Sequence, residues 1–132
     1  MPKYLVSYLK DFAGVTPRFG SRVLYFRQDL VTAYDVMVMT TGIRLEEDID
    51  SVVVLNWDML LENAQTASLE KRFLYYLSCS YTRGTIQGFA AITTTFPSPI
   101  CDESDVRKVE ALICKRKDYS SATLLSCKSI QD

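Results

Sequence analysis

The stretch Asp102-Glu-Ser-Asp-Val-Arg-Lys-Val-Glu-Ala-Leu-Ile-Cys-Lys-Arg-Lys117 has the pattern of one complete α-helix. Asp102 and Asp105 have the spacing of a capping box, which satisfies the first free N–H groups of a helix. The basic residues at the other end suit the negative pole of the helix dipole. We therefore expect a helix here, with Val106, Val109, Leu112 and Ile113 facing inward and Arg107, Lys108, Glu110 and Lys115 facing outward.

The same pattern occurs 70 residues earlier, since residues 19–58 align with 89–128 without a gap. This alignment gives eight identical pairs, where chance gives roughly two or three. The pairs are Phe19/Phe89, Phe26/Phe96, Asp35/Asp105, Val36/Val106, Ile43/Ile113, Asp48/Asp118, Ser51/Ser121 and Leu55/Leu125. The sequence therefore predicts an internal duplication.

Each copy is predicted to contain two strands, a helix and a third strand. The expected strands are 3–10, 21–27 and 51–57 in the first copy, and 73–82, 88–96 and 121–128 in the second. In the first copy Thr32 and Asp35 form the capping box, and Val36, Met39 and Ile43 lie on one helical face. Residues 11–20 are expected to form a loop, and residues 46–48 a solvated acidic loop after the helix.

The predicted fold is α+β, as a single domain over residues 1–132. Repeat 1 covers residues 3–58 and repeat 2 covers 73–130. The linker, 59–72, is polar and suits a short helix. Because a unit of about 60 residues buries little surface alone, we expect the two ββαβ units to form one sheet of about six strands, with both helices on one face.

The composition argues against an enzyme. The chain has no histidine, which excludes Ser-His-Asp and Cys-His catalysis and histidine-ligated zinc. No Gly-rich phosphate-binding loop is present, and Cys79, Cys101, Cys114 and Cys127 form no Cys-x-x-Cys pair. We therefore expect no catalytic residue, cofactor or metal, and four reduced thiols that pack as small apolar side chains.

The start of the chain does not resemble a secretory signal peptide, and no apolar run is long enough to span a bilayer. These features predict a cytoplasmic protein with no membrane partner. The net charge of −1 provides no general attraction for nucleic acid. Nucleic acid is therefore the least favoured class of partner.

Three groups of residues are candidates for contact with a partner protein. The acidic group suits a basic partner, the tyrosines suit the exposed face of a sheet, and the basic group suits an acidic partner. Tyr75 and Tyr76 point to opposite faces of their strand, so that one of them faces away from the helices. The candidates are Glu46, Glu47, Asp48 and Asp50; Tyr75 and Tyr76; and Arg107, Lys108, Lys115, Arg116 and Lys117.

Three short motifs, Tyr4-Leu-Val-Ser-Tyr8, Phe19-Gly20 and Val52-Val-Val-Leu-Asn56, carry a resemblance. Together they resemble the beginning, middle and end of small uncharacterised bacterial proteins, many of them carried by phages and other mobile elements. The resemblance covers residues 3–57. The second copy departs from it, because Gly88-Phe89 inverts the order of Phe19-Gly20. The resemblance implies an accessory protein that acts by contact against a host defence or regulatory protein, and it brings no catalytic residues.

Three hypotheses about function follow. The first is a non-enzymatic protein-interaction module. The second is a small-molecule or nucleotide-binding domain with its ligand between the two repeats. The third is nucleic-acid contact through the second helix. The sequence leaves the partner's identity and the formation of homo-oligomers open.

Overall fold

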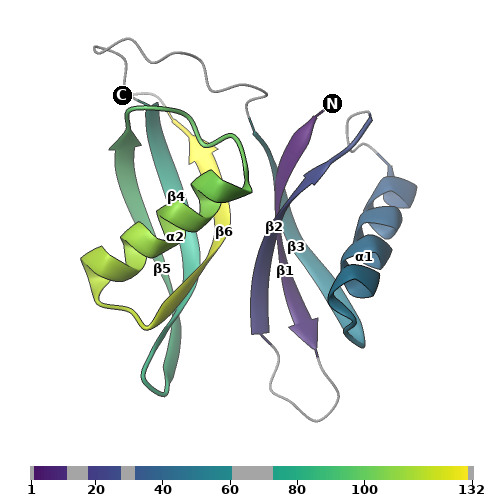
Figure 1. Ribbon diagram of the computed structural model, residues 1–132, viewed down its shortest axis with the longest axis horizontal. Coiled ribbons are helices and arrows are strands. Elements are labelled where there is room, and N and C mark those ends of the chain that lie inside the picture. The colour runs from purple at the N-terminus through teal and green to yellow at the C-terminus, as the bar shows by residue number, and fades with distance from the viewer. Residues whose placement is uncertain (1, 12–17, 28–31, 61–72, 131–132) are drawn as a thin grey trace.

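A computed structural model describes residues 2–11, 18–27, 32–60 and 73–130 (Figure 1). The predicted α+β class is confirmed, and each half has the predicted order of two strands, a helix and a strand. The elements are β1 (Lys3–Asp11), β2 (Arg18–Tyr25), α1 (Ala33–Glu47), β3 (Ser51–Leu60), β4 (Phe73–Arg83), β5 (Ile86–Phe96), α2 (Glu103–Lys117) and β6 (Ser121–Ser129). Residues 12–17 of the expected loop and 61–72 of the expected linker lie outside the described residues.

The prediction of one six-stranded sheet is wrong. The strands form two three-stranded antiparallel sheets, a first sheet with the order β2-β1-β3 and a second with the order β5-β4-β6. The helices do not share one face, because α1 packs on the first sheet and α2 on the second (Figure 1). We call β1–β3 with α1 the first unit, and β4–β6 with α2 the second unit.

Side chains occupy the two strand edges that would have joined the sheets. On β6, the N–H of Leu124 donates to Glu110 Oε2 at 2.7 Å, and that of Cys127 donates to Asp58 Oδ2 at 3.0 Å. On β2, the carbonyl of Ser21 accepts from Arg107 Nη2 at 2.6 Å. These groups satisfy edge N–H and C=O groups that another strand would otherwise pair. Strand β6 therefore contacts all three strands of the first sheet without pairing with any of them.

Both helices begin and end in the same way. The capping boxes at Thr32/Asp35 and Asp102/Asp105 are confirmed. Each helix ends at an aspartate in the left-handed conformation, Asp48 with φ 53° and Asp118 with φ 59°. The expected loop at 46–48 is wrong, since helix α1 continues through Glu47. The reason is that the left-handed aspartate, and not the preceding acidic pair, ends the helix.

Strand β1 is buried on both faces. Tyr4, Val6 and Tyr8 pack with Met39 and Ile43 of α1, as the helical spacing predicts. The opposite face of β1 contributes to the core of the second unit. That core contains Leu5, Val23 and Leu60 together with Tyr75, Leu77, Cys79, Ile100, Val106, Val109, Ile113, Leu124 and Cys127. The two units therefore share one of their two hydrophobic cores.

The inward residues of α2 are confirmed at Val106, Val109 and Ile113, and Leu112 is half-buried. The outward prediction for Glu110 is wrong, because this residue is 8% exposed. Its carboxylate accepts from Arg107 Nη1 at 2.7 Å, Ser21 Oγ at 3.0 Å and the Leu124 N–H. A charge in this position is tolerated because three donors replace its lost hydration.

The two units have the same strand order and place a β-bulge at the same aligned position. In β3, Leu55 lies between the partners of Tyr8 and Ser7; in β6, Leu125 lies between the partners of Cys79 and Ser78. The duplication itself stays a prediction. Within the described ranges, no helix is long and apolar enough to cross a membrane.

Candidate functional site

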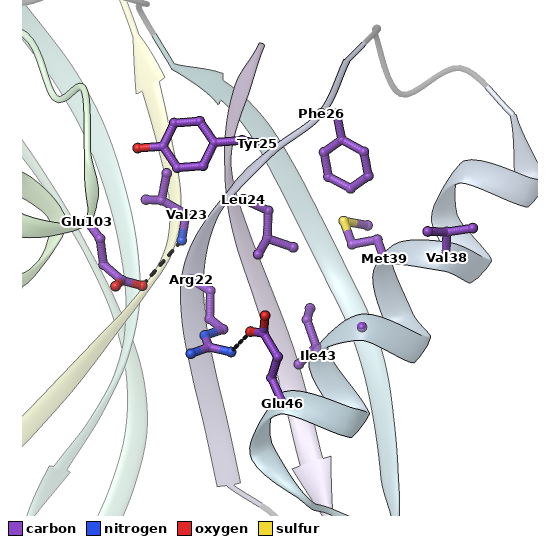
Figure 2. A pocket seen from close by; sticks show the side chains of 11 residues that line it. Arg22, Val23, Leu24, Tyr25, Phe26, Val38, Met39, Ile43, Glu46 and Glu103 are labelled. Atoms are coloured by element: carbon purple, nitrogen blue, oxygen red, sulfur yellow. Dashed lines mark hydrogen bonds and ion pairs between the residues drawn. The ribbon is translucent and has the colours of Figure 1, made fainter. Parts of the chain in front are cut away.

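A groove of about 400 Å³ runs between α1 and the edge strand β2 (Figure 2). Its apolar lining comes from both sides. Leu24 of β2 and Phe26, just after the strand, line one side, and Met39 and Ile43 of α1 line the other (Figure 2). The groove is open because α1 packs against β3 and the centre of the sheet and leaves β2 partly uncovered. It is large enough to accept apolar side chains of another molecule.

The outward face of α1 is also apolar. Tyr34 and Leu45 are each 67% exposed, and Met37 and Val38 are 55% and 45% exposed. These residues recur at helical spacing on the side away from Met39 and Ile43, with the small Thr41 and Gly42 between them. Exposed apolar residues that gather on one face commonly mark an interaction surface. Helix α1 therefore carries an apolar surface that the described part of the chain does not cover.

Gly42 forms a notch at the border of the groove and this apolar surface. A Cβ atom at this position would meet no atom within 4 Å. The open space lies between Val38 and Glu46, one turn away on either side, and all three residues line the groove. Such a notch fits a side chain that projects from a second helix packed across α1.

The rim of the groove carries two ion pairs, and exposed carboxylates lie beyond it. Arg22 forms an ion pair with Glu46 across it (Figure 2), and Glu103 of the second unit lies on the opposite side. Glu103 has Arg107 as its ion-pair partner, at 3.4 Å. Asp48 and Asp50, just beyond α1, are exposed. Asp48 and Asp50 have no ion pair among the described residues, and their charge favours a basic ligand.

The backbone of β2 offers little to a partner strand. Its outer edge presents the carbonyl of Ser21, which binds Arg107, and the N–H of Val23, which faces Glu103 Oε1 at 3.4 Å (Figure 2). An added strand would have to displace both side chains. The groove is therefore suited to side-chain contacts with a partner and not to extension of the sheet.

The predicted acidic group lies at one end of the first unit, but its members differ. Glu46, Asp48 and Asp50 are exposed. Glu47 is not a solvated residue, because it accepts a hydrogen bond from the Tyr8 hydroxyl at 2.7 Å and pairs with Lys10 at 3.8 Å. Burial, followed by the hydrogen bond to Glu47, raises the pKa of Tyr8. Glu47 therefore fixes the end of α1 to β1.

The two predicted tyrosines do face opposite sides of β4. Tyr75 is 5% exposed, and its hydroxyl oxygen accepts from the Ile100 N–H at 3.1 Å. Tyr76 is 45% exposed on the face away from α2, which also carries the exposed Phe89. Tyr75 is a core residue and takes no part in the exposed surface.

The predicted basic group is divided between two places. Arg107 lies between the units, where it contacts Ser21 and Glu110. Lys108 is exposed on α2. Lys115, Arg116 and Lys117 lie at the end of α2 that points away from the first unit (Figure 1). The acidic and basic candidates therefore do not form one surface.

An aromatic pair beside this basic end was not predicted. Tyr81 and Tyr119 stack with ring centroids 4.0 Å apart, and Arg83 lies 5.2 Å from the Tyr119 ring. Arg83 also donates to the carbonyl oxygens of Lys117 and Asp118 at the end of α2. Arg116 donates to Thr94 at 3.2 Å. Both arginines thus have structural roles.

The cysteines behave as packing residues. Cys79, Cys101 and Cys127 are buried free thiols, and Cys114 is half-buried. Burial raises the pKa of all four thiols, that of Cys127 to about 12. A thiol protonated at neutral pH is a poor nucleophile.

Sequence reasoning did not identify the outward residues of α1 as a surface. The available signal was the apolar content of residues 33–47 outside the predicted inward face. In the part of the chain that the structure describes, no group of three or more Cys, Asp or Glu residues has the arrangement of a metal site. In comparisons with known proteins, the chain matches no protein-family model and no curated protein.

Proposed function

We propose that this protein is a non-enzymatic interaction module that binds an amphipathic helix of another protein on α1. The observation that carries the proposal is the apolar outward face of α1, which is continuous with the groove at Val38. The partner helix would lay its apolar face on Tyr34, Val38 and Leu45, and one of its side chains would enter the notch at Gly42. This is the mode by which helices commonly bind apolar surfaces.

The carboxylates near the groove indicate that the partner helix is basic. Glu46 and Glu103 flank the groove, and Asp48 and Asp50 follow the helix. A helix with lysine or arginine beside its apolar face would find complementary charge here. The resemblance to mobile-element proteins suggests a host regulatory or defence protein as the source of this helix, which the module would block by contact.

The test uses the full chain with a photoreactive amino acid in place of Met37, incubated in a lysate of the host cell. The expected crosslink is to an apolar segment flanked by basic residues. Val38→Glu and Leu45→Glu should each weaken capture at least tenfold, because both replace apolar contacts with charge. Ala111→Glu, at an exposed position of α2, is the matched control and should leave capture unchanged.

Two results would contradict the proposal. One is a crosslinked segment that is acidic or extended instead of helical and basic. The other is capture that Val38→Glu and Ala111→Glu reduce equally. Circular dichroism of each variant would show that the helices are intact, which is expected because the substituted side chains are exposed.

A further inference from the structure

A second cavity, also of about 400 Å³, lies between the two units. The first unit contributes Arg18 and Phe19 at the beginning of β2. The second unit contributes residues from all three of its strands and from the β4–β5 turn. These residues are Ser80, Tyr81, Thr82, Gly84, Gln87, Ser121 and Thr123. The cavity is separate from the groove beside α1, and the two share no lining residue.

Five polar side chains of this cavity lie on one face of the second sheet. Thr82 is opposite Gln87 on one side and Ser121 on the other, and Ser80 is opposite Thr123. Residues directly opposite one another in antiparallel strands share a face. Four hydroxyl groups and one amide therefore gather on the side of the sheet away from α2.

Ser80 is the distinctive member of this group. It is 5% exposed, and its hydroxyl has no hydrogen-bond partner among the described residues. By contrast, the hydroxyls of Thr82 and Ser121 bond to each other at 2.5 Å. Among the described residues, the buried side-chain oxygens without a hydrogen-bond partner are Ser7 Oγ and Glu47 Oε2, so the Ser80 oxygen is not sealed off from the cavity. The Ser80 hydroxyl is thus available to a ligand in the cavity.

The positive charge of Arg18 favours a negatively charged ligand in the cavity. Among the described residues that line the cavity, Arg18 is the only charged one and none carries a carboxylate. Arg18 forms no ion pair with the residues that the structure describes. Hydroxyl groups and a guanidinium are the donors that commonly hold phosphate oxygens.

We propose that this cavity binds a small phosphate monoester. The phosphate group contacts the hydroxyls of Ser80 and Thr123, with Arg18 as its counter-charge. Phe19 provides an apolar wall for the group esterified to the phosphate. The volume lies within the range of small-molecule sites, which hold more than a free ion. This site does not depend on the protein-binding function proposed for α1.

The proposal is tested by titrating the ¹⁵N-labelled full chain with inorganic phosphate, ribose 5-phosphate and adenosine 5′-monophosphate at constant ionic strength. The expected result is a set of amide shifts centred on Ser80, Gln87 and Thr123, with tighter binding of at least one ester than of inorganic phosphate. Thr123→Val keeps the shape of the side chain and removes its hydroxyl. It should weaken binding about tenfold or more, in line with the loss of a hydrogen bond to a charged group.

Two further variants separate binding from structure. Ser80→Ala should weaken binding by a similar factor and leave the stability of the free protein unchanged or raised, because the hydroxyl has no partner there. Thr93→Val is the matched control, on an exposed position of the same sheet face outside the cavity. It should bind the esters like the original chain.

Three results would overturn the proposal. The first is no shift with any of the three compounds. The second is binding that Thr123→Val leaves unchanged. The third is inorganic phosphate that binds as tightly as both esters, which would exclude recognition of an attached group.

Discussion

The ring of Tyr8 occupies the space that a side chain at Gly20 would need. The two residues lie opposite each other in β1 and β2, and a Cβ atom at Gly20 would come within 2.6 Å of the Tyr8 ring. The second unit repeats this relationship, since Tyr81 lies opposite Gly88 and its hydroxyl oxygen would be 2.6 Å from a Cβ there. In both hairpins an aromatic ring thus covers a glycine on the neighbouring strand.

Gly20→Ala should therefore lower the free energy of unfolding by about 1–3 kcal/mol, the usual effect of overpacking a core. Tyr8 cannot easily move, because it is 1% exposed and bonded to Glu47. Gly42→Ala is the control, as its Cβ meets nothing and alanine favours a helix by about 1 kcal/mol. Urea unfolding should show opposite signs for the two variants. A neutral Gly20→Ala would contradict this account.

Gly88→Ala should have a smaller effect than Gly20→Ala. Tyr81 is only half-buried, and its ring is held by stacking on Tyr119. The atoms that a Cβ at Gly88 would meet are at the far end of this ring, which has solvent on one side and can move away. The same urea measurement on both variants checks this order, and a larger loss in Gly88→Ala would show that Tyr81 is the more constrained ring.

Glu110→Leu should lower the free energy of unfolding by about 1–3 kcal/mol, because the buried N–H of Leu124 loses its acceptor. Glu103→Leu is a matched control on the same helix. The Glu103 side chain is 49% exposed, so its ion pair with Arg107 should contribute less than about 1 kcal/mol. Equal effects in chemical denaturation would mean that Glu110 does not close the edge of β6.

Stability should fall in alkaline solution. The folded state raises the pKa of Cys127 from 9.0 to about 12, so the unfolded chain loses this proton first. The thiol's contribution is therefore complete below pH 9 and is lost as the pH rises toward 12, at up to about 1.4 kcal/mol per pH unit. Urea unfolding in reductant at several pH values should show a shallower decline for Cys127→Ala. Parallel declines would assign the effect to the other thiols or to tyrosine.

The helix ends provide another test. Asp118 adopts φ 59° at the end of α2, a conformation that costs a β-branched residue about 1–2 kcal/mol. Asp118→Val should therefore lower the thermal midpoint, and Asp118→Gly should leave it unchanged or raise it. Since both variants remove the same charge, a loss of stability in both would indicate that the carboxylate matters more than the backbone conformation.

The sequence predicts the local structure of this chain well, because local signals determine it. The capping residues Asp102 and Asp105, and the spacing of Val106, Val109 and Ile113, depend on neighbours within the same helix. The alignment of the two halves also locates α1, whose β-branched residues alone are weak helix formers.

The arrangement of the two sheets depends on contacts across the chain that no local pattern encodes. The helical pattern predicts that Glu110 is exposed. It is buried because Ser21 of the first unit and Leu124 of β6 both donate hydrogen bonds to its carboxylate. Asp58 likewise lies in an apolar strand, and its role depends on Cys127 and Lys128 of the other unit. The outward face of α1 was missed for a related reason: the spacing of Met39 and Ile43 identifies the inward side, but whether the apolar residues on the other side are covered depends on where the rest of the chain lies.

Leu5 and Leu60 belong to the same core as Leu77 and Leu124. Although the sequence divides into two similar halves, neither half contains all of the apolar side chains that form its hydrophobic core. We expect the molecule to melt in a single cooperative transition, and each half expressed alone to be unstable. Substitutions in one half would then be constrained by the side chains of the other half.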